Sequence, residues 1–340
     1  MLCQMIHKIT IMWLALILFF SFSSCRPPEP ESRNEGLPHW CRIYFTPRDP
    51  VEEKLVSLID SVRGKILAAF YSLDVEEVIE ALWRAHKRGV DVRLIMDDAN
   101  VGPPVRKLKA AGLIRADLAP HDFMHNKFMV VDDFISWTGS YNPTKLGTER
   151  DNNNIIVIAS RKLAAAYEDE FEEMWGGKFG RDSPGPTSVT SFDIKGTALE
   201  NYFSPEDDCA RRIIIEIKRA RRSIYFALFT FTLPSVAQAL LEKDREGINV
   251  RGVMERGQNS PWNCFRILQD CGIDVRWDEN LYYLHHKFFV IDGETVITGS
   301  FNPSRHARTA NDENLLIIHN RAVARRYLAE FHRLRERNWE

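Results

Sequence analysis

The chain contains one nineteen-residue pattern twice. The stretch HNKFMVVDDFISWTGSYNP begins at His125, and HHKFFVIDGETVITGSFNP begins at His285, which is 285 − 125 = 160 residues later. The His, Lys, Asp, Gly, Ser, Asn and Pro positions match, whereas several apolar positions differ. A repeat at a fixed separation indicates a duplicated structural unit. The fold is therefore expected to consist of two similar halves, and the matched polar residues to serve one chemistry.

The similarity extends well beyond these two stretches. From Tyr44 and from Tyr202 onward, each half shows a short strand, a helix, an apolar strand, a second helix and another apolar strand. Residues 55–62 carry apolar side chains at three- and four-residue spacing, which predicts the first helix. Gly89 and Gly247 stand where a helix C-cap favours a left-handed residue. The two halves are thus expected to share one order of elements.

Strands that alternate with helices predict an α/β fold. Each half is expected to form a mixed β-sheet flanked by helices. A pseudo-two-fold axis would relate the two lobes, which makes the chain a monomer containing an internal pseudo-dimer. The stretch GRDSPGPTSVTSFDIKG is rich in Pro, Gly and Ser, as linkers are. The predicted segments are a signal peptide at 1–24, a tether at 25–40, the first lobe at 41–180, a linker at 181–195 and the second lobe at 196–340.

The amino-terminal residues are predicted to be a targeting segment. An apolar run from Ile9 to Phe20 leads through small residues to Cys25, which is typical of a secretory signal and short for a membrane span. The SSC ending is similar to the lipobox of bacterial lipoproteins, although Phe22 stands where Leu is usual. We expect an exported protein, in the periplasm or at the cell surface, anchored to a membrane by a lipid on Cys25. The alternatives are an ordinary secretory signal and an uncleaved anchor. The tether would reach about 20 Å.

Composition constrains the partner only weakly. The formal net charge of −2 lacks the basic excess of a dedicated nucleic-acid binder. Two basic runs, at 218–222 and 333–337, are interpreted as solvated helix faces. Four cysteines follow the targeting segment in a spacing that fits no metal site, and whether they pair is left open. They are Cys41, Cys209, Cys264 and Cys271.

Each copy of the repeated pattern places a His and a Lys on one face of a strand. Residues two apart in an extended strand point the same way, so His125 and Lys127 share a face, as do His285 and Lys287. The same rule turns His286 to the opposite face. Apolar residues follow each Lys, which indicates a rigid, buried strand. The sequence therefore predicts two His–Lys pairs held on rigid supports.

The duplicated residues suit an anion better than a metal ion. Two lysines would repel a cation, and the pattern supplies no carboxylate cluster. Ammonium groups together with Ser and Asn donors instead suit a phosphodiester. One imidazole can attack phosphorus while the other protonates the leaving oxygen and later deprotonates water. The neutral donors that follow each Gly are Ser140, Asn142, Ser300 and Asn302.

With its duplicated His-x-Lys-x4-Asp-x6-Gly-Ser-x-Asn pattern, the chain resembles the phospholipase D superfamily over both lobes. The resemblance implies metal-independent phosphodiester cleavage through a covalent phosphohistidine at the interface of two α/β lobes, without a cofactor. It implies His125 as the nucleophile and His285 as the general acid and base. The residues implied to bind phosphate are Lys127, Lys287, Asn142 and Asn302, with Ser140 and Ser300 in support. Asp132 and Asp292 would be structural or would orient the histidines.

One difference between the halves bears on the two histidines. The sequence NDEN contains Glu313, at the position of an acidic residue that in family members hydrogen-bonds a catalytic imidazole; DNNN places Asn153 there in the first half. A carboxylate raises the basicity of an imidazole more than an amide does. The two histidines are therefore expected to titrate differently. The sequence leaves open which of them contacts Glu313.

Fold does not determine the substrate. The expected lipid anchor would bring the enzyme close to phospholipid, and Trp262 is a side chain that would suit an interface, although packing is its default interpretation. We expect hydrolysis of phospholipid headgroups. The alternative is a nuclease that cleaves DNA or RNA, which the short loops of compact lobes favour. A phosphatidyl transferase of the cardiolipin synthase type and a non-catalytic phosphate-binding scaffold are weaker alternatives.

Overall fold

The computed structural model describes residues 34–118, 122–183, 185–187 and 189–336. The chain divides into two units, Met1–Glu35 and Gly36–Glu340, and every element named below belongs to the second. The predicted signal peptide and the lipidation site Cys25 lie outside the described residues. Within the described ranges, no helix combines the length and apolar character needed to span a membrane.

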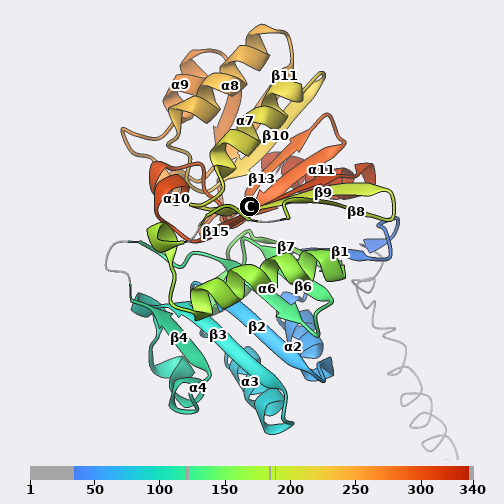
Figure 1. Cartoon of the computed structure of the whole chain (residues 1–340). Helices are drawn as coiled ribbons and strands as arrows, with labels where there is room; N and C mark the ends of the chain where they lie inside the picture. Colours follow the sequence, from blue (N-terminus) through green and yellow to red (C-terminus); the bar gives the residue numbers. More distant parts are fainter. Residues whose placement is uncertain (1–33, 119–121, 184, 188, 337–340) are drawn as a thin grey trace, which may run out of the picture. The chain divides into compact units, whose positions relative to one another are not determined.

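The first lobe is built on a seven-stranded mixed sheet (Figure 1). Its strands, in spatial order, are β1 (Cys41–Phe45), β7 (Asn154–Ala159), β6 (Ile135–Gly139), β5 (Lys127–Val131), β2 (Lys65–Phe70), β3 (Asp91–Asp97) and β4 (Ile114–Asp117). The neighbours β2, β3 and β4 are parallel, and the other pairs are antiparallel. The helices of this lobe are α2 (Val51–Ser61), α3 (Glu76–Lys87), α4 (Arg106–Ala110), α5 (Lys145–Glu149) and α6 (Arg161–Trp175).

The second lobe repeats this order in an eight-stranded sheet. Its strands are β8 (Ser191–Ile194), β9 (Thr197–Ser204), β15 (Glu313–His319), β14 (Thr295–Gly299), β13 (Lys287–Ile291), β10 (Ser223–Leu228), β11 (Asn249–Met254) and β12 (Asp274–Trp277). Its helices are α7 (Cys209–Arg219), α8 (Pro234–Arg245), α9 (Phe265–Asp270), α10 (Arg305–Thr309) and α11 (Arg321–Glu336). The predicted duplication and the α/β class with two similar lobes are confirmed.

Three apolar layers follow from this arrangement. One core lies between the first sheet and helices α2, α3 and α4, and another lies between the second sheet and helices α7, α8 and α9. The third joins the lobes, because α6 and α11 pack between the two sheets (Figure 1). Gly89 and Gly247 both have φ near +86°, so each ends its helix in the left-handed conformation that was predicted.

Other features differ from the sequence-based expectations. Residues 181–195 do not form only a linker, because β8 lies within them and pairs with β9. The basic run at 333–337 is not a solvated face throughout: the Arg335 side chain is 7% exposed and forms an ion pair with Asp274. The cysteines at 41, 209, 264 and 271 are all free thiols. Trp262, expected to pack, is 82% exposed.

Candidate active site

Beside the repeated histidines, the backbones of the two lobes are hydrogen-bonded to each other. The His125 N–H donates to the Asp312 carbonyl at 3.0 Å, and the His285 N–H donates to the Asn152 carbonyl at 2.9 Å. Two isolated parallel bridges, Met124 with Asp312 and Asn152 with Leu284, accompany these bonds. Each histidine is therefore held against the start of the last sheet strand of the opposite lobe.

Buried side-chain hydrogen bonds fix the lobes in this relation. The Asn154 amide donates to the Thr298 hydroxyl at 2.7 Å, and in the mirrored contact the Asn314 amide donates to the Thr138 hydroxyl at 2.9 Å. All four side chains are buried. Because such bonds are costly to break when buried, the spacing between the two histidines is set by the lobe interface rather than by one lobe alone.

The cross-lobe contact gives the two histidines different partners. His125 Nδ1 lies 2.8 Å from the Glu313 carboxylate, and His285 Nδ1 lies 2.8 Å from the Asn153 amide oxygen. Both acceptors are essentially fully buried. The question that the sequence left open is thereby answered: Glu313 contacts His125. With Nδ1–H bound in each ring, Nε2 is the nitrogen left to react.

The two lysines lie next to the histidines with the same geometry in each lobe. Lys127 Nζ donates to the His125 carbonyl and Lys287 Nζ to the His285 carbonyl, both at 2.7 Å. Each ammonium also lies over an aromatic ring, 5.2 Å from the centre of Tyr71 in the first lobe and 4.9 Å from that of Phe229 in the second. The lysines are nearly fully buried.

Burial shifts the titration of these groups strongly. It lowers the pKa of Lys127 to about 7 and holds that of Lys287 well below its usual value. Burial, followed by the two lysine charges, also holds the pKa values of both histidines well below 6.5. It raises the pKa of Glu313 to about 7, against the opposing effect of Lys127. An anion placed among these groups would stabilise the charged lysines, so the site is suited to bind one.

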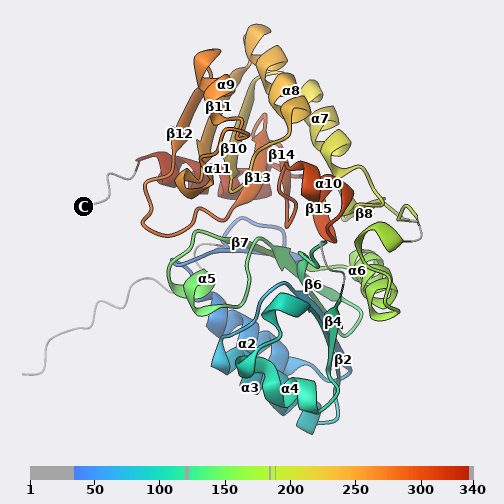
Figure 2. The ribbon, with the colours of Figure 1, turned by 90° about the vertical axis from the view of Figure 1, so that its left-hand side faces the viewer.

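A cavity of about 480 Å³ opens over the two histidines. Its wall combines residues of both lobes, including Leu146 of α5 and His306 of α10. Figure 2 shows these two helices at the junction of the lobes. The predicted site residues that line it are His125, His285, Asn142 and Asn302, with Asn153 beside them. The structure thus brings the two halves of the repeated pattern to one cavity.

The two serines predicted to bind phosphate lie beneath the cavity instead. Ser140 and Ser300 are fully buried. The Ser140 hydroxyl donates to the Asn153 amide oxygen at 3.0 Å, and the Ser300 hydroxyl hydrogen-bonds Glu313. Each serine therefore supports the side chain that holds a histidine. Direct contact with phosphate, as expected from the sequence, does not fit this position.

Asp132 and Asp292 do not contact the histidines. The Asp132 carboxylate accepts backbone N–H groups of residues 63–65, and that of Asp292 accepts those of residues 221–223. Both follow the far ends of β5 and β13 and have positive φ angles. Of the two roles expected for them, the structural one fits, and the orientation of His125 and His285 does not.

His286 points away from the cavity, as the strand periodicity predicts. Its side chain is fully buried, with Nδ1 3.2 Å from the Asn154 amide oxygen and Nε2 3.3 Å from the Glu330 carboxylate. It occupies the apolar layer between the sheets, at the position that Asn126 holds in the first lobe. This histidine is a structural residue.

Sequence reasoning missed the aromatic and acidic parts of the wall. Tyr71 and Phe229 pack edge-on against His125 and His285, with ring centres 5.1 and 4.9 Å apart. They occupy equivalent positions of the repeat, so the aligned halves contained a signal for them. Asp151 also lines the cavity; burial raises its pKa and the Lys287 charge opposes this.

Exposed apolar side chains contribute to the cavity wall. Phe123, Leu146 and Tyr283 line the cavity and are 42%, 55% and 50% exposed; Leu281, two residues before Tyr283 in the chain, is 95% exposed. Scattered exposed apolar residues are common, and the three that line the cavity differ in lying together at one site.

Comparisons with known proteins agree with this architecture. A family model described as "Cardiolipin synthase, PLD-like domain" matches residues 55–175 and 213–335. The mitochondrial cardiolipin hydrolase of Xenopus laevis is 34% identical over 163 residues, covering 45% of this chain and 76% of the relative. A phospholipase D of Rickettsia felis is 32% identical over 137 residues, covering 40% and 68%.

Solved structures support the fold of the whole two-lobed unit. Phosphatidylserine synthase of Haemophilus influenzae superposes with a TM-score of 0.67 and 12% identity, covering 86% of each chain. Polyphosphate kinase of Porphyromonas gingivalis gives a TM-score of 0.64 and 13% identity, covering 88% of this chain and 51% of the other. At these identities the likeness concerns the fold alone.

Proposed function

This chain belongs to the phospholipase D superfamily, and on that premise we propose that it is a metal-independent phosphodiesterase that hydrolyses the headgroup phosphodiester of phospholipids. The observation that carries the proposal is the pair of unequal contacts at one cavity, His125 with Glu313 and His285 with Asn153. Two imidazoles with different partners are what a nucleophile and a general acid require.

In the first step, His125 is the nucleophile. Glu313 accepts the Nδ1–H and makes Nε2 the more basic nitrogen, which attacks phosphorus and forms a P–N bond. The bond from phosphorus to the leaving oxygen breaks, and that oxygen takes a proton from Nε2 of His285, which is protonated in the complex because the bound phosphodiester anion raises its pKa. Asn153 is neutral, so it stabilises a protonated His285 less than a carboxylate would, and the proton transfers more readily.

In the second step, His285 acts as a base. Its Nε2 removes a proton from water as the water oxygen attacks phosphorus, and the P–N bond to His125 breaks. The products are a phosphate monoester and the free enzyme, with His285 again protonated. Each lobe supplies one histidine and the partner of the other, so neither lobe forms a complete site.

The lysines and asparagines bind the phosphoryl oxygens in this scheme. Lys127 and Lys287 flank the histidines with positive charge, which stabilises charge on the phosphoryl oxygens in a site of low dielectric. Asn142 and Asn302 line the cavity with amide groups that can donate to the same oxygens. Two ammonium groups disfavour a cation at this position, which supports chemistry without a metal ion.

The cavity mouth supports lipid as the substrate. Its exposed Phe123, Leu146 and Tyr283 offer apolar surface to acyl chains or to a bilayer interface. The net charge of −2 gives no general attraction to a polyanion. The nuclease alternative draws on the same aromatic side chains, because bases stack on exposed rings. We further propose that the chain acts as a monomer, tethered to a membrane through its amino-terminal segment and Cys25.

The test is a side-by-side substrate assay in EDTA. The full chain, in detergent, is offered mixed phospholipid vesicles, single-stranded DNA and RNA. Release of a headgroup from vesicles, lost in His125→Ala and His285→Ala variants that remain folded, supports the proposal. Cleavage of nucleic acid with intact lipid overturns the lipid assignment but keeps the chemistry. Turnover that survives either histidine substitution overturns the chemistry.

A further inference from the structure

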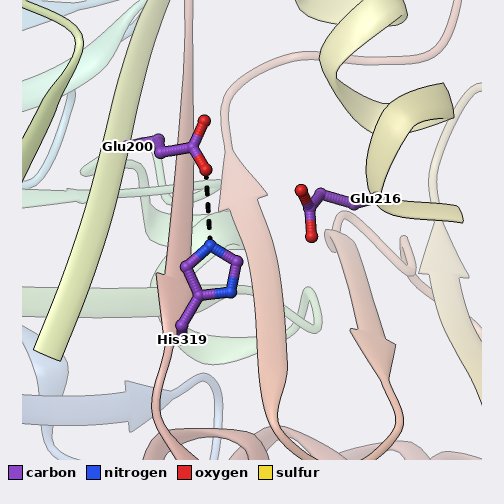
Figure 3. A group of neighbouring side chains, drawn as sticks. All are labelled: Glu200, Glu216 and His319. Carbon is purple, nitrogen blue, oxygen red and sulfur yellow. Dashed lines mark hydrogen bonds and ion pairs between the residues drawn. The ribbon is translucent and has the colours of Figure 1, made fainter. Parts of the chain in front are cut away.

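A second cluster of chemically active side chains lies in the second lobe, away from the cavity. Glu200 of β9, Glu216 of α7 and His319 at the end of β15 point toward one another (Figure 3). One ligand atom from each lies within 4.8 Å of the other two. His319 Nε2 is 3.3 Å from a Glu200 carboxylate oxygen. We refer to these three residues as the Glu–Glu–His cluster.

The sheet register and the helix face account for this convergence. β9 and β15 are antiparallel with Glu200 opposite Ile317, so Glu200 and His319, two residues further on, share a face of the sheet. Helix α7 covers that face. Its buried positions include Ile213, Glu216 and Ile217, which places Glu216 on the inward, apolar side of the helix.

The second ring nitrogen of His319 is fixed by its own partner. The Thr295 hydroxyl lies 3.0 Å from His319 Nδ1, and Thr295 stands directly opposite His319 in the sheet. This contact orients the ring and turns Nε2 toward Glu200. A partner on one imidazole nitrogen that aims the other is the usual support for a metal-ligating histidine.

The duplication shows that the fold does not need these three side chains. In the first lobe, the matching registers of β1 with β7 and of β9 with β15 identify the two corresponding strand positions, and the aligned sequences of the two halves identify the helix position. Those positions hold Arg42, Leu58 and Ala159. One lobe therefore forms the same structure with no ligating group at any of the three. Glu216 is only 4% exposed, so its carboxylate needs a positively charged partner to offset the cost of burial.

We propose that the Glu–Glu–His cluster binds one Zn²⁺ ion, which joins α7 to β9 and β15. Zinc binds His nitrogen and carboxylate oxygen at metal–ligand distances of about 2.0–2.2 Å, so two ligand atoms of a tetrahedral site lie about 3.4 Å from each other. The 3.3 Å between His319 and Glu200 matches this spacing. The two side chains form a hydrogen bond, which the ion would replace. A side-chain rotation of Glu216 completes three protein ligands, with water as the fourth.

Arg219 is the competitor for this ion. Its guanidinium pairs with Glu216 at 2.5 Å, but the Arg219 side chain is 64% exposed and can turn to solvent when a cation binds. The Tyr202 hydroxyl donates to the other oxygen of Glu200, which leaves the oxygen facing His319 available. The guanidinium and the ion compete for one carboxylate, so removing the guanidinium should strengthen metal binding.

Zinc titration of the full chain tests the proposal. The chain, purified in detergent and stripped of metal with EDTA, is titrated with ZnCl₂ by calorimetry, and the complex is measured by X-ray absorption at the zinc edge. We expect one ion per chain, bound by nitrogen and oxygen with an imidazole signature and no sulfur at 2.3 Å. The sulfur criterion separates this site from the exposed thiol of Cys271.

Variants chosen from the first lobe keep the fold intact. His319→Ala and Glu216→Leu install the residue types of Ala159 and Leu58, and each should weaken zinc binding by about 100-fold or more; Thr295→Val should weaken it by about 10–100-fold. Arg219→Ala should tighten binding. His332→Ala, an exposed histidine of α11, is the matched control and should change nothing.

The outcomes are decisive in both directions. Loss of zinc in the two ligand variants, with unchanged binding in the control, supports the site. A wild-type chain that takes up no stoichiometric zinc overturns the proposal, as does equal binding by His319→Ala. If a ligand variant unfolds, Glu200→Gln, which removes one ligand charge with little change of shape, gives the same comparison.

Discussion

The Glu313→Gln substitution tests the mechanism at the contact that distinguishes the two histidines. Burial raises the pKa of Glu313 from 4.5 to about 7, a shift of 7 − 4.5 = 2.5. Since one pKa unit corresponds to about 1.4 kcal/mol, holding this charge in the free enzyme costs about 3 kcal/mol. When His125 becomes a cationic phosphohistidine, the Glu313 carboxylate 2.8 Å from its Nδ1 stabilises the positive charge on the ring. Glutamine is neutral and lacks this electrostatic stabilisation, so kcat should fall about 10²–10³-fold.

The pH dependence of the wild type follows from the same shifts. Below about pH 7 Glu313 is protonated, its charge is lost, and kcat/KM should fall as the pH falls. The pKa of Lys127 is also lowered to about 7, so its charge is lost as the pH rises. The profile of kcat/KM, which reports the free enzyme, should therefore be a narrow bell near neutral pH. Glu313→Gln should lose the acid limb and keep the alkaline one.

The assay uses bis(p-nitrophenyl) phosphate, a chromogenic phosphodiester that does not depend on whether lipid or nucleic acid is the natural substrate. Glu330→Gln is the matched control, because it removes the carboxylate from His286, a buried His–Glu pair outside the cavity. It should lower stability while leaving the pH profile unchanged. A Glu313→Gln enzyme with kcat within about threefold of the wild type and an intact acid limb would refute the reasoning, because that difference is below 1 kcal/mol.

Three further outcomes are expected. His285→Ala should retain formation of the phosphohistidine with p-nitrophenol as leaving group, because that group needs no acid, whereas His125→Ala should form none; acid-quench trapping distinguishes them. Lys127→Met should abolish turnover yet raise the free energy of unfolding by a few kcal/mol below pH 7, where the wild type carries the buried charge. This difference in stability should vanish as the pH approaches 10.5, the usual pKa of the unfolded lysine. Urea titrations at several pH values measure it. Asp132→Asn should cost about 1–2 kcal/mol of stability with kcat unchanged, since its carboxylate accepts backbone N–H groups only; a loss of kcat would return Asp132 to the site.

The fold and the His–Lys pairs could be predicted because local periodicity encodes them. Strand alternation separated His285 from His286 correctly, since it depends only on the pleat. The same geometry could also have corrected Asp132. It follows His125 by seven residues, or about 23 Å along an extended strand, which places it at the opposite end. Its match within the repeat indicated a shared role but said nothing about contact with the histidine.

The contact between His125 and Glu313 could not be read from one lobe. It depends on how the two sheets dock through α6 and α11, and the residues lie 188 positions apart. The serines are a different case, because Ser140 and Asn153 lie at the ends of the neighbouring strands β6 and β7 of one lobe, where the Ser140 hydroxyl donates to the Asn153 amide oxygen; the repeated pattern did not indicate this contact. The difference between NDEN and DNNN was the signal available, and it indicated asymmetry without saying to which histidine the carboxylate belonged.

The duplication within one chain is what permits this asymmetry. If two identical lobes formed such a site, each histidine would meet the same partner, and the two imidazoles would have equal affinity for a proton. In the fused chain, a single difference between positions 153 and 313 gives one histidine a carboxylate and the other an amide, while the serine beneath each is kept. Because each partner comes from the opposite lobe, the lobes can diverge at this position without changing either strand that carries a histidine. In the proposed mechanism, the division of labour between nucleophile and acid is therefore a property of the lobe interface, and substitutions that loosen the buried Asn154–Thr298 and Asn314–Thr138 bonds should impair both steps together.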